Sequence, residues 1–189
     1  MKNRHVVLIS RPSGVAQADN FAIRESELEP LPEGRIRVRN AFLSVEPAMR
    51  GWIADKGNYS GPVEIGSTMR ALAVGEVVET RHADYRVGET VTGWFGWQEI
   101  ATVAPAAVVR RVRETDLPLS LALGVLGING VTALIGLELI GEPKAGDTVL
   151  VSTAAGAVGS AVGQIANIRG CRTVGIAGGP RREGARRSR

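Results

Sequence analysis

Apolar and polar positions alternate over much of residues 1–115, in short runs that turn residues separate. Residues 35–40 read RIRVRN, and this period of two is typical of a strand with one buried face. Similar patterns predict further strands over 71–80, 87–93, 98–103 and 108–112. Many short strands with regular breaks indicate a small, barrel-like β-domain.

The pattern changes near Leu117. Apolar positions then follow helical spacing over 119–126 and 131–140, and the segment 127–130 separates these two predicted helices. The pattern next predicts an apolar strand over 147–152, a helix over 157–168 capped by Gly170, and a second strand over 172–177. Strand, helix and strand in this order predict a parallel βαβ unit, so the fold class is α/β.

Charge is concentrated at one end of the sequence. The net charge of the chain is +4, and residues 181–189 contain five arginines and one glutamate. The rest of the chain therefore balances 18 basic against 18 acidic residues. The arginine-rich segment has no interleaved aromatic residues, so we expect neither a nucleic-acid partner nor membrane attachment.

One uncharged stretch, residues 117–137, is long enough to cross a bilayer. It contains Pro118, Asn129 and several glycines, which favour a buried helical segment instead. The N-terminal apolar run is too short for a signal peptide. Cys171 is the one cysteine, so no internal disulfide forms, and the cytoplasm is the expected location.

The segment between the first strand and helix of the βαβ unit has the spacing of a dinucleotide-binding turn. Residues 154–159 read AAGAVG, which is the G-x-G-x-x-G spacing with alanine first. Small residues permit a tight turn, close approach of the backbone to a pyrophosphate, and close helix packing. The positive end of the helix then faces the phosphates. The candidate cofactor contacts here are Ala154, Gly156, Ala157, Val158 and Gly159.

The end of the second strand of this unit discriminates between the two nicotinamide cofactors. An acidic residue there would bind the free ribose hydroxyl of NAD, but this chain has Ala177 followed by Gly178, Gly179 and Pro180. Arg181 and Arg182 come next. Small residues with nearby basic groups favour NADP(H), and Gly178 joins the candidate cofactor contacts.

Four segments in this order resemble the medium-chain dehydrogenase/reductase superfamily, and within it the zinc-independent, NADP-dependent enone and alkenal reductases of the prostaglandin reductase type. These segments are 42–52 (FLSVEPAMRGW), 75–79 with 85–93, 126–133 (LGINGVTA) and 154–159. The resemblance implies a GroES-like catalytic β-domain over 1–116 and the first part of a Rossmann domain over 117–179. Residues 180–189 depart from the family and are interpreted as an aberrant tail after a change of reading frame.

The resemblance also implies a reaction and a set of site residues. The implied reaction is hydride transfer from NADPH to the C=C bond of an α,β-unsaturated ketone or aldehyde, with quinone reduction as a variant. Asn129, Gly130 and Thr132 are expected near the nicotinamide. Hydride transfer leaves negative charge on the carbonyl oxygen of the substrate, which becomes an enolate. Family members often have tyrosines at the positions of Ala48 and Leu134, and this chain lacks both hydroxyls. Tyr59 is therefore a candidate hydrogen-bond donor to the enolate. Arg50 either places its charge next to the substrate or forms an ion pair with a structural role.

Zinc-dependent relatives need a cluster of Cys, His and carboxylate ligands. This chain has one cysteine and two histidines, His5 and His82, in unrelated contexts, so no metal site is expected. Full-length members form homodimers through the Rossmann edge, and the lack of that edge here argues against such a dimer. The alternative function is an inactive, truncated remnant that serves as a binding or interaction module.

Overall fold

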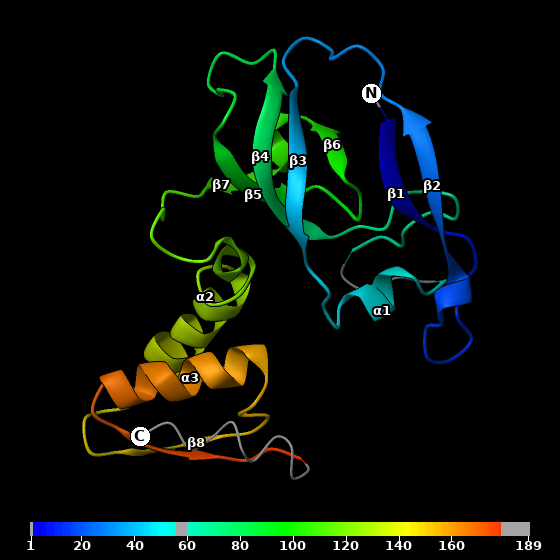
Figure 1. The fold of residues 1–189 in the computed structure, drawn as a ribbon. Coiled ribbons are helices and arrows are strands. Elements are labelled where there is room, and N and C mark those ends of the chain that lie inside the picture. Colours follow the sequence, from blue (N-terminus) through cyan, green and yellow to red (C-terminus); the bar gives the residue numbers. More distant parts are fainter. Residues whose placement is uncertain (1, 56–59, 179–189) are drawn as a thin grey trace. The chain divides into compact units, whose positions relative to one another are not determined.

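The computed structural model describes residues 2–55 and 60–178, and Figure 1 shows their fold. The chain divides into two compact units, Met1–Ser120 (unit 1) and Leu121–Arg189 (unit 2). Strands dominate unit 1, whereas unit 2 combines helices with a short parallel sheet. The predicted α/β fold is confirmed.

Unit 1 is built on a five-stranded antiparallel sheet of order β6-β3-β4-β5-β7. Its strands are β3 (Ile36–Leu43), β4 (Leu72–Thr80), β5 (Thr90–Trp94), β6 (Ile100–Val103) and β7 (Val108–Arg111). A one-turn 3₁₀ helix, η2 (Pro105–Ala107), joins the last two strands. The inward positions of the alternating pattern form one buried cluster of Ile36, Val38, Ala73, Val77, Val91, Phe95 and Ala101.

A second, two-stranded sheet of unit 1 was not predicted. Strands β1 (Lys2–Leu8) and β2 (Phe21–Glu27) pair antiparallel, with the 3₁₀ helix η1 (Ala18–Asn20) between them. Isolated bridges from His5 to Gln98 and from Val7 to Thr68 connect β1 to the rest of unit 1.

The short helix α1 (Met49–Trp52) was also missed, because it lies inside a segment that reads as a loop. Its buried side chains Met49 and Trp52 face Leu8 of β1 in a second apolar cluster. Val63, Met69 and Ala71 belong to the same cluster, so α1 and β1 share one core.

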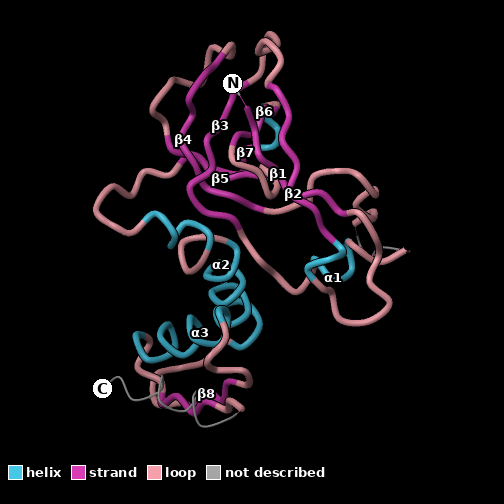
Figure 2. Tube along the Cα trace, turned by 45° about the vertical axis from the view of Figure 1, so that its right-hand side comes forward, coloured by secondary structure: helices cyan, strands magenta, loops and turns pink. Residues whose placement is uncertain are grey.

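Unit 2 contains the predicted βαβ unit. Strands β8 (Thr148–Val151) and β9 (Arg172–Gly175) pair in parallel, and α3 (Ala157–Ile168) connects them. Figure 2 shows α3 beside β8 within this unit. A small core of Leu137, Ala166 and Cys171 packs between the helices and the sheet. Helix α3 has the predicted bounds, and Gly170 follows its end with a φ of 78°.

The two helices predicted before β8 differ from the structure. The first is a 3₁₀ helix, η3 (Leu119–Leu123), and the second begins earlier, as α2 (Ile128–Ile135). The predicted break at 127–130 was wrong, because Gly127 is the N-cap of α2 and Gly130 lies in its first turn. Beyond α2 the chain widens into a π-helical turn, η4 (Gly136–Gly141), where a continuous α-helix was expected.

Candidate functional site

The turn between β8 and α3 continues the parallel pairing of the sheet beyond its strands. The amide of Ile176 donates to the carbonyl of Val151 at 2.8 Å, and the amide of Ala154 donates to the carbonyl of Ile176 at 2.9 Å. The amide of Gly156 then closes the turn on the carbonyl of Thr153 at 2.8 Å. These bonds fix the turn against the carboxyl ends of both strands, which is where ligands bind in open α/β sheets.

Steric contacts explain the small residues of this turn. A Cβ atom on Gly159 would lie 2.4 Å from the carbonyl oxygen of Thr153, and a Cβ on Gly156 would lie 3.1 Å from the same oxygen. Thr153 itself has a left-handed φ of 53°, which is uncommon for a β-branched residue. The sequence assigned Gly159 to packing against the strand, and the structure places it against the turn residue that follows the strand.

Among the described residues, the first amides of α3 have no backbone acceptor, and they lie beside this turn. The amides of Ala157, Val158 and Gly159 precede the first backbone bond of the helix, from Ser160 to the carbonyl of Gly156 at 2.9 Å. The first turn carries no acidic residue. A helix start of this kind attracts anions through its amides and its dipole.

A cavity of about 360 Å³ lies at this corner of unit 2. Its lining residues are Ser152, Thr153, Ala155, Gly156, Ile176, Ala177 and Gly178. Two of the predicted cofactor residues, Gly156 and Gly178, therefore line it. Ala154, Ala157, Val158 and Gly159 form the adjoining turn and helix start. The sequence did not single out Ser152 and Thr153, although hydroxyl residues directly after a buried strand were a visible signal.

The predicted nicotinamide-side residues lie together on α2, with side chains that bond locally. Thr132 Oγ1 donates to the carbonyl of Ile128 at 2.7 Å, and Asn129 Nδ2 donates to the carbonyl of Leu123 at 3.3 Å. Position 130 requires glycine because a Cβ there would lie 1.7 Å from the carbonyl oxygen of Val125. None of the three lines the 360 Å³ cavity.

The two predicted catalytic residues belong to unit 1. Arg50 is an exposed residue of α1, and its Nε donates to the carbonyl of Gly14 at 3.1 Å. Tyr59 lies outside the described residues. The preceding loop is fixed by Ser44, whose hydroxyl accepts from the amide of Leu72 at 3.1 Å and contacts the carboxylate of Glu46 at 3.0 Å.

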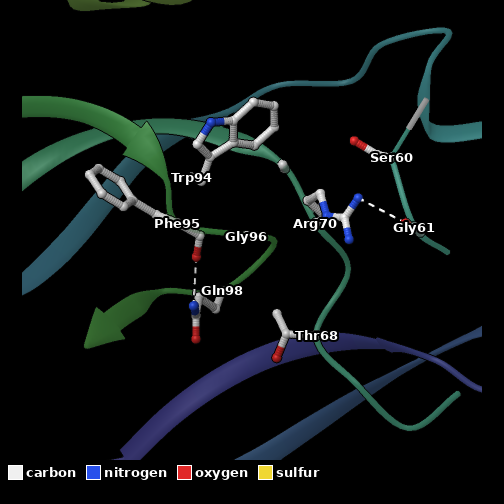
Figure 3. A pocket seen from close by; sticks show the side chains of 9 residues that line it. Ser60, Gly61, Thr68, Arg70, Trp94, Phe95, Gly96 and Gln98 are labelled. Carbon is white, nitrogen blue, oxygen red and sulfur yellow. Dashed lines mark hydrogen bonds between the residues drawn. The ribbon is translucent and has the colours of Figure 1, made fainter. Parts of the chain in front are cut away.

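Unit 1 also contains a cavity of about 650 Å³ that sequence reasoning missed (Figure 3). Three separate chain segments supply its walls, which are formed by Ser60, Gly61, Thr68, Arg70, Ala71, Trp94, Phe95, Gly96 and Gln98. Arg70 is the one ionisable residue among them. The aromatic pair Trp94 and Phe95 at the end of β5, and Arg70 two residues before β4, were the available signals.

Two further observations bear on the sequence predictions. Within residues 2–55 and 60–178, no group of three or more His, Cys, Asp and Glu side chains is placed to hold a metal ion. In the same part of the chain, every helix is too short or too polar to cross a bilayer. The uncharged stretch at 117–137 is instead divided between η3, α2 and the start of η4.

Comparisons with known proteins give a consistent picture. Residues 4–111 match the family described as the N-terminal domain of oxidoreductase. The chain is 43% identical over 178 residues to the NADPH-dependent curcumin reductase of Escherichia coli, covering 94% of this chain and 51% of that protein. It is 34% identical over 182 residues to the NADP(+)-dependent 2-alkenal reductase of Nicotiana tabacum, covering 94% and 53%.

A solved structure agrees with the sequence relatives. CurA from Vibrio vulnificus, in complex with NADPH, matches with a TM-score of 0.84 and 42% identity, over 94% of this chain and 52% of that chain. The chain thus spans about half the length of the relatives it matches.

Proposed function

Since the chain belongs to the medium-chain dehydrogenase/reductase superfamily, we propose that it binds NADPH at the turn 152–159 and serves reduction of the C=C bond of α,β-unsaturated ketones and aldehydes. The observation that carries the proposal is the corner of unit 2. There, the first amides of α3 adjoin a cavity at the carboxyl ends of two parallel strands.

The residues at this corner fit a diphosphate. Gly159 leaves no room for a side chain and Gly156 leaves little, so backbone amides are the groups presented to a ligand. The absence of an acidic residue in the first turn of α3 removes a source of repulsion. Ala177 and Gly178 follow shortly after β9 and carry no carboxylate that would bind a free ribose hydroxyl, which supports NADPH over NADH.

When bound, the cofactor supplies the hydride, and the protein's task is to orient the substrate and stabilise charge on its carbonyl oxygen. Tyr59 is proposed as a donor to that oxygen, and Asn129, Gly130 and Thr132 as the nicotinamide side of the site. The contact of Arg50 with the Gly14 carbonyl supports its structural role over a substrate contact. The reaction is assigned to a β-domain over 1–116 and a cofactor domain over 117–179.

A glycine-to-alanine pair in α3 tests the cofactor site by calorimetric titration with NADPH. Gly159→Ala forces a Cβ against Thr153 and should weaken binding at least about tenfold, or ~1.4 kcal/mol. Gly163→Ala is the matched control, because a Cβ there meets nothing within 4 Å. A folded parent chain that binds no NADPH would favour the alternative, a binding module without a cofactor.

Activity is a separate question from binding. We expect the chain to oxidise NADPH in the presence of trans-4-phenylbut-3-en-2-one and to yield the saturated ketone, which mass spectrometry identifies. NADPH binding without this turnover would overturn the proposed reaction and leave the cofactor site intact. Turnover of the matching saturated ketone to an alcohol, in place of the enone, would assign a different reaction.

A further inference from the structure

The 650 Å³ cavity of unit 1 has a cationic wall and an aromatic wall (Figure 3). The size is that of small-molecule sites in proteins. Three of the lining side chains decide its chemistry, namely Arg70, Trp94 and Gln98. All three lie in unit 1.

Arg70 is held in place by two contacts with the described residues. Its Nη1 donates to the carbonyl of Gly61 at 3.1 Å, and its guanidinium lies over the ring of Trp52, 5.4 Å from the centroid. Trp52 is buried, so this stacking surface is fixed. A guanidinium has five N–H donors. Within the described residues, no carboxylate forms an ion pair with Arg70.

Trp94 of the aromatic wall packs against the buried Trp52 behind it. Their rings meet edge to face, with centroids 5.9 Å apart and an interplanar angle of 69°. Trp94 lines the cavity, and 42% of this large aromatic residue is exposed. An exposed indole beside the guanidinium of Arg70 offers a flat apolar surface and a charge at the same place.

The side-chain amide of Gln98 is already hydrogen-bonded to other residues of unit 1. Its Nε2 donates to the carbonyl of Phe95 at 2.6 Å, and its Oε1 accepts from Asn3 Nδ2 at 3.0 Å. Both polar atoms of this side chain are therefore satisfied inside unit 1. The cavity is left with one strong recognition group, which is the cation of Arg70.

We propose that this cavity binds the carboxylate end of a planar, conjugated substrate, with Arg70 as the counter-ion and Trp94 as the stacking surface. The proposal rests on the proposed function only for calling the occupant a substrate. A carboxylate matches the fork of a guanidinium, and charge-assisted bonds of this type are about twice as strong as neutral ones. The substrates favoured are aromatic or otherwise planar enones that carry an acid group, ahead of their neutral esters.

The test uses trans-cinnamate and methyl trans-cinnamate as probes, because both are planar and only the first is charged. Calorimetric titration of the full chain should show the acid binding at least about tenfold more tightly than the ester. Arg70→Gln should abolish this difference. Arg70→Lys should retain part of it, since lysine keeps the charge without the fork. The exposed Arg24 gives the matched control, and Arg24→Gln should leave the preference unchanged.

Equal affinity of the parent chain for acid and ester would overturn the proposal, as would a preference that survives Arg70→Gln. The comparison of acid with ester in the parent chain stands even if the glutamine variant fails to fold. The NMR signal of the Trp94 indole N–H should shift with the acid, and a shift confined to other residues would place the ligand elsewhere. NADPH titration remains independent: acid binding without NADPH binding refutes the proposed function alone.

Discussion

The two units of the chain use their apolar residues differently. In unit 1, three residues as far apart as Leu8, Val38 and Val91 are all completely buried. In unit 2, Leu139, Ile140, Leu150 and Ile168 are between 64% and 81% exposed. The buried set of unit 2 is short and made mostly of small residues: Ala122, Ala133, Leu137, Val151, Ala161, Ala166 and Cys171.

The difference follows from the two kinds of strand pattern. Alternating strands need only one covered face, and the sheets of unit 1 with α1 supply it. The continuous apolar run of β8 is typical of a parallel strand covered on both faces. Helix α3 covers one face through Val149, whereas Leu150 on the other face stays 64% exposed. The sequence pattern therefore predicted correctly that β8 is a parallel strand. It did not predict that one face of β8 is left uncovered by the described residues.

The largest expected contrast comes from the same substitution in each unit. Ile36 is completely buried in β3, and Ile168 is 81% exposed at the end of α3. Ile36→Ala should cost about 2–5 kcal/mol of unfolding free energy in unit 1. Ile168→Ala should change the stability of unit 2 by less than about 0.5 kcal/mol.

Hydrogen–deuterium exchange with peptide resolution reports the two units separately. Loss of protection in unit 1 should follow Ile36→Ala only. A large destabilisation of unit 2 by Ile168→Ala would mean that this side chain is covered, and the contrast between the units would fail.

A smaller effect is expected at the ion pair that joins η4 to the end of α3. Arg169 Nε lies 2.6 Å from Glu138 Oε1, and both side chains are partly exposed. Arg169→Gln should lower the stability of unit 2 by about 0.2–1 kcal/mol, with the effect shrinking at high salt. The exposed Arg172 of β9 provides the control, because Arg172→Gln removes the same charge without this pair. Equal effects of both variants would assign the loss to net charge.

The smallest effect is a pH dependence in unit 1. The side-chain hydrogen bond from Arg4 lowers the pKa of Glu99 below its ordinary value. A lowered pKa adds stability above the unfolded-state pKa of the group, and that stability is lost as pH falls through the folded-state pKa. Chemical denaturation across the acidic range should therefore show a shallower loss for Glu99→Gln than for the parent chain. Glu64→Gln, at another exposed position of unit 1, should follow the parent curve.

The sequence predicted the elements whose signals are local. The period of two located β3 to β7, and the small residues of the turn with Gly170 located α3 at both ends. It missed β2, because the strand FAIRESE is largely exposed and charged and so lacks an apolar face. It missed α1, which has four residues and forms because Met49 and Trp52 pack into the core of unit 1.

The two candidate sites also differ in whether their residues are close together in the sequence. The cofactor turn could be predicted because strand, turn and helix are contiguous in the chain. The 650 Å³ cavity could not, because its lining comes from three separate segments, 60–61, 68–71 and 94–98, that tertiary packing brings together. Positive φ at Thr153 was also beyond prediction, since threonine has no preference for that conformation.

The most direct test of the cofactor assignment is hydrogen–deuterium exchange of the full chain with and without saturating NADPH. We expect slower exchange at the amides of residues 152–159 and 176–178. At 100 times the dissociation constant, protection should approach about 2.7 kcal/mol, or roughly a hundredfold. Unchanged exchange over both segments, with the cofactor demonstrably bound, would contradict the assignment.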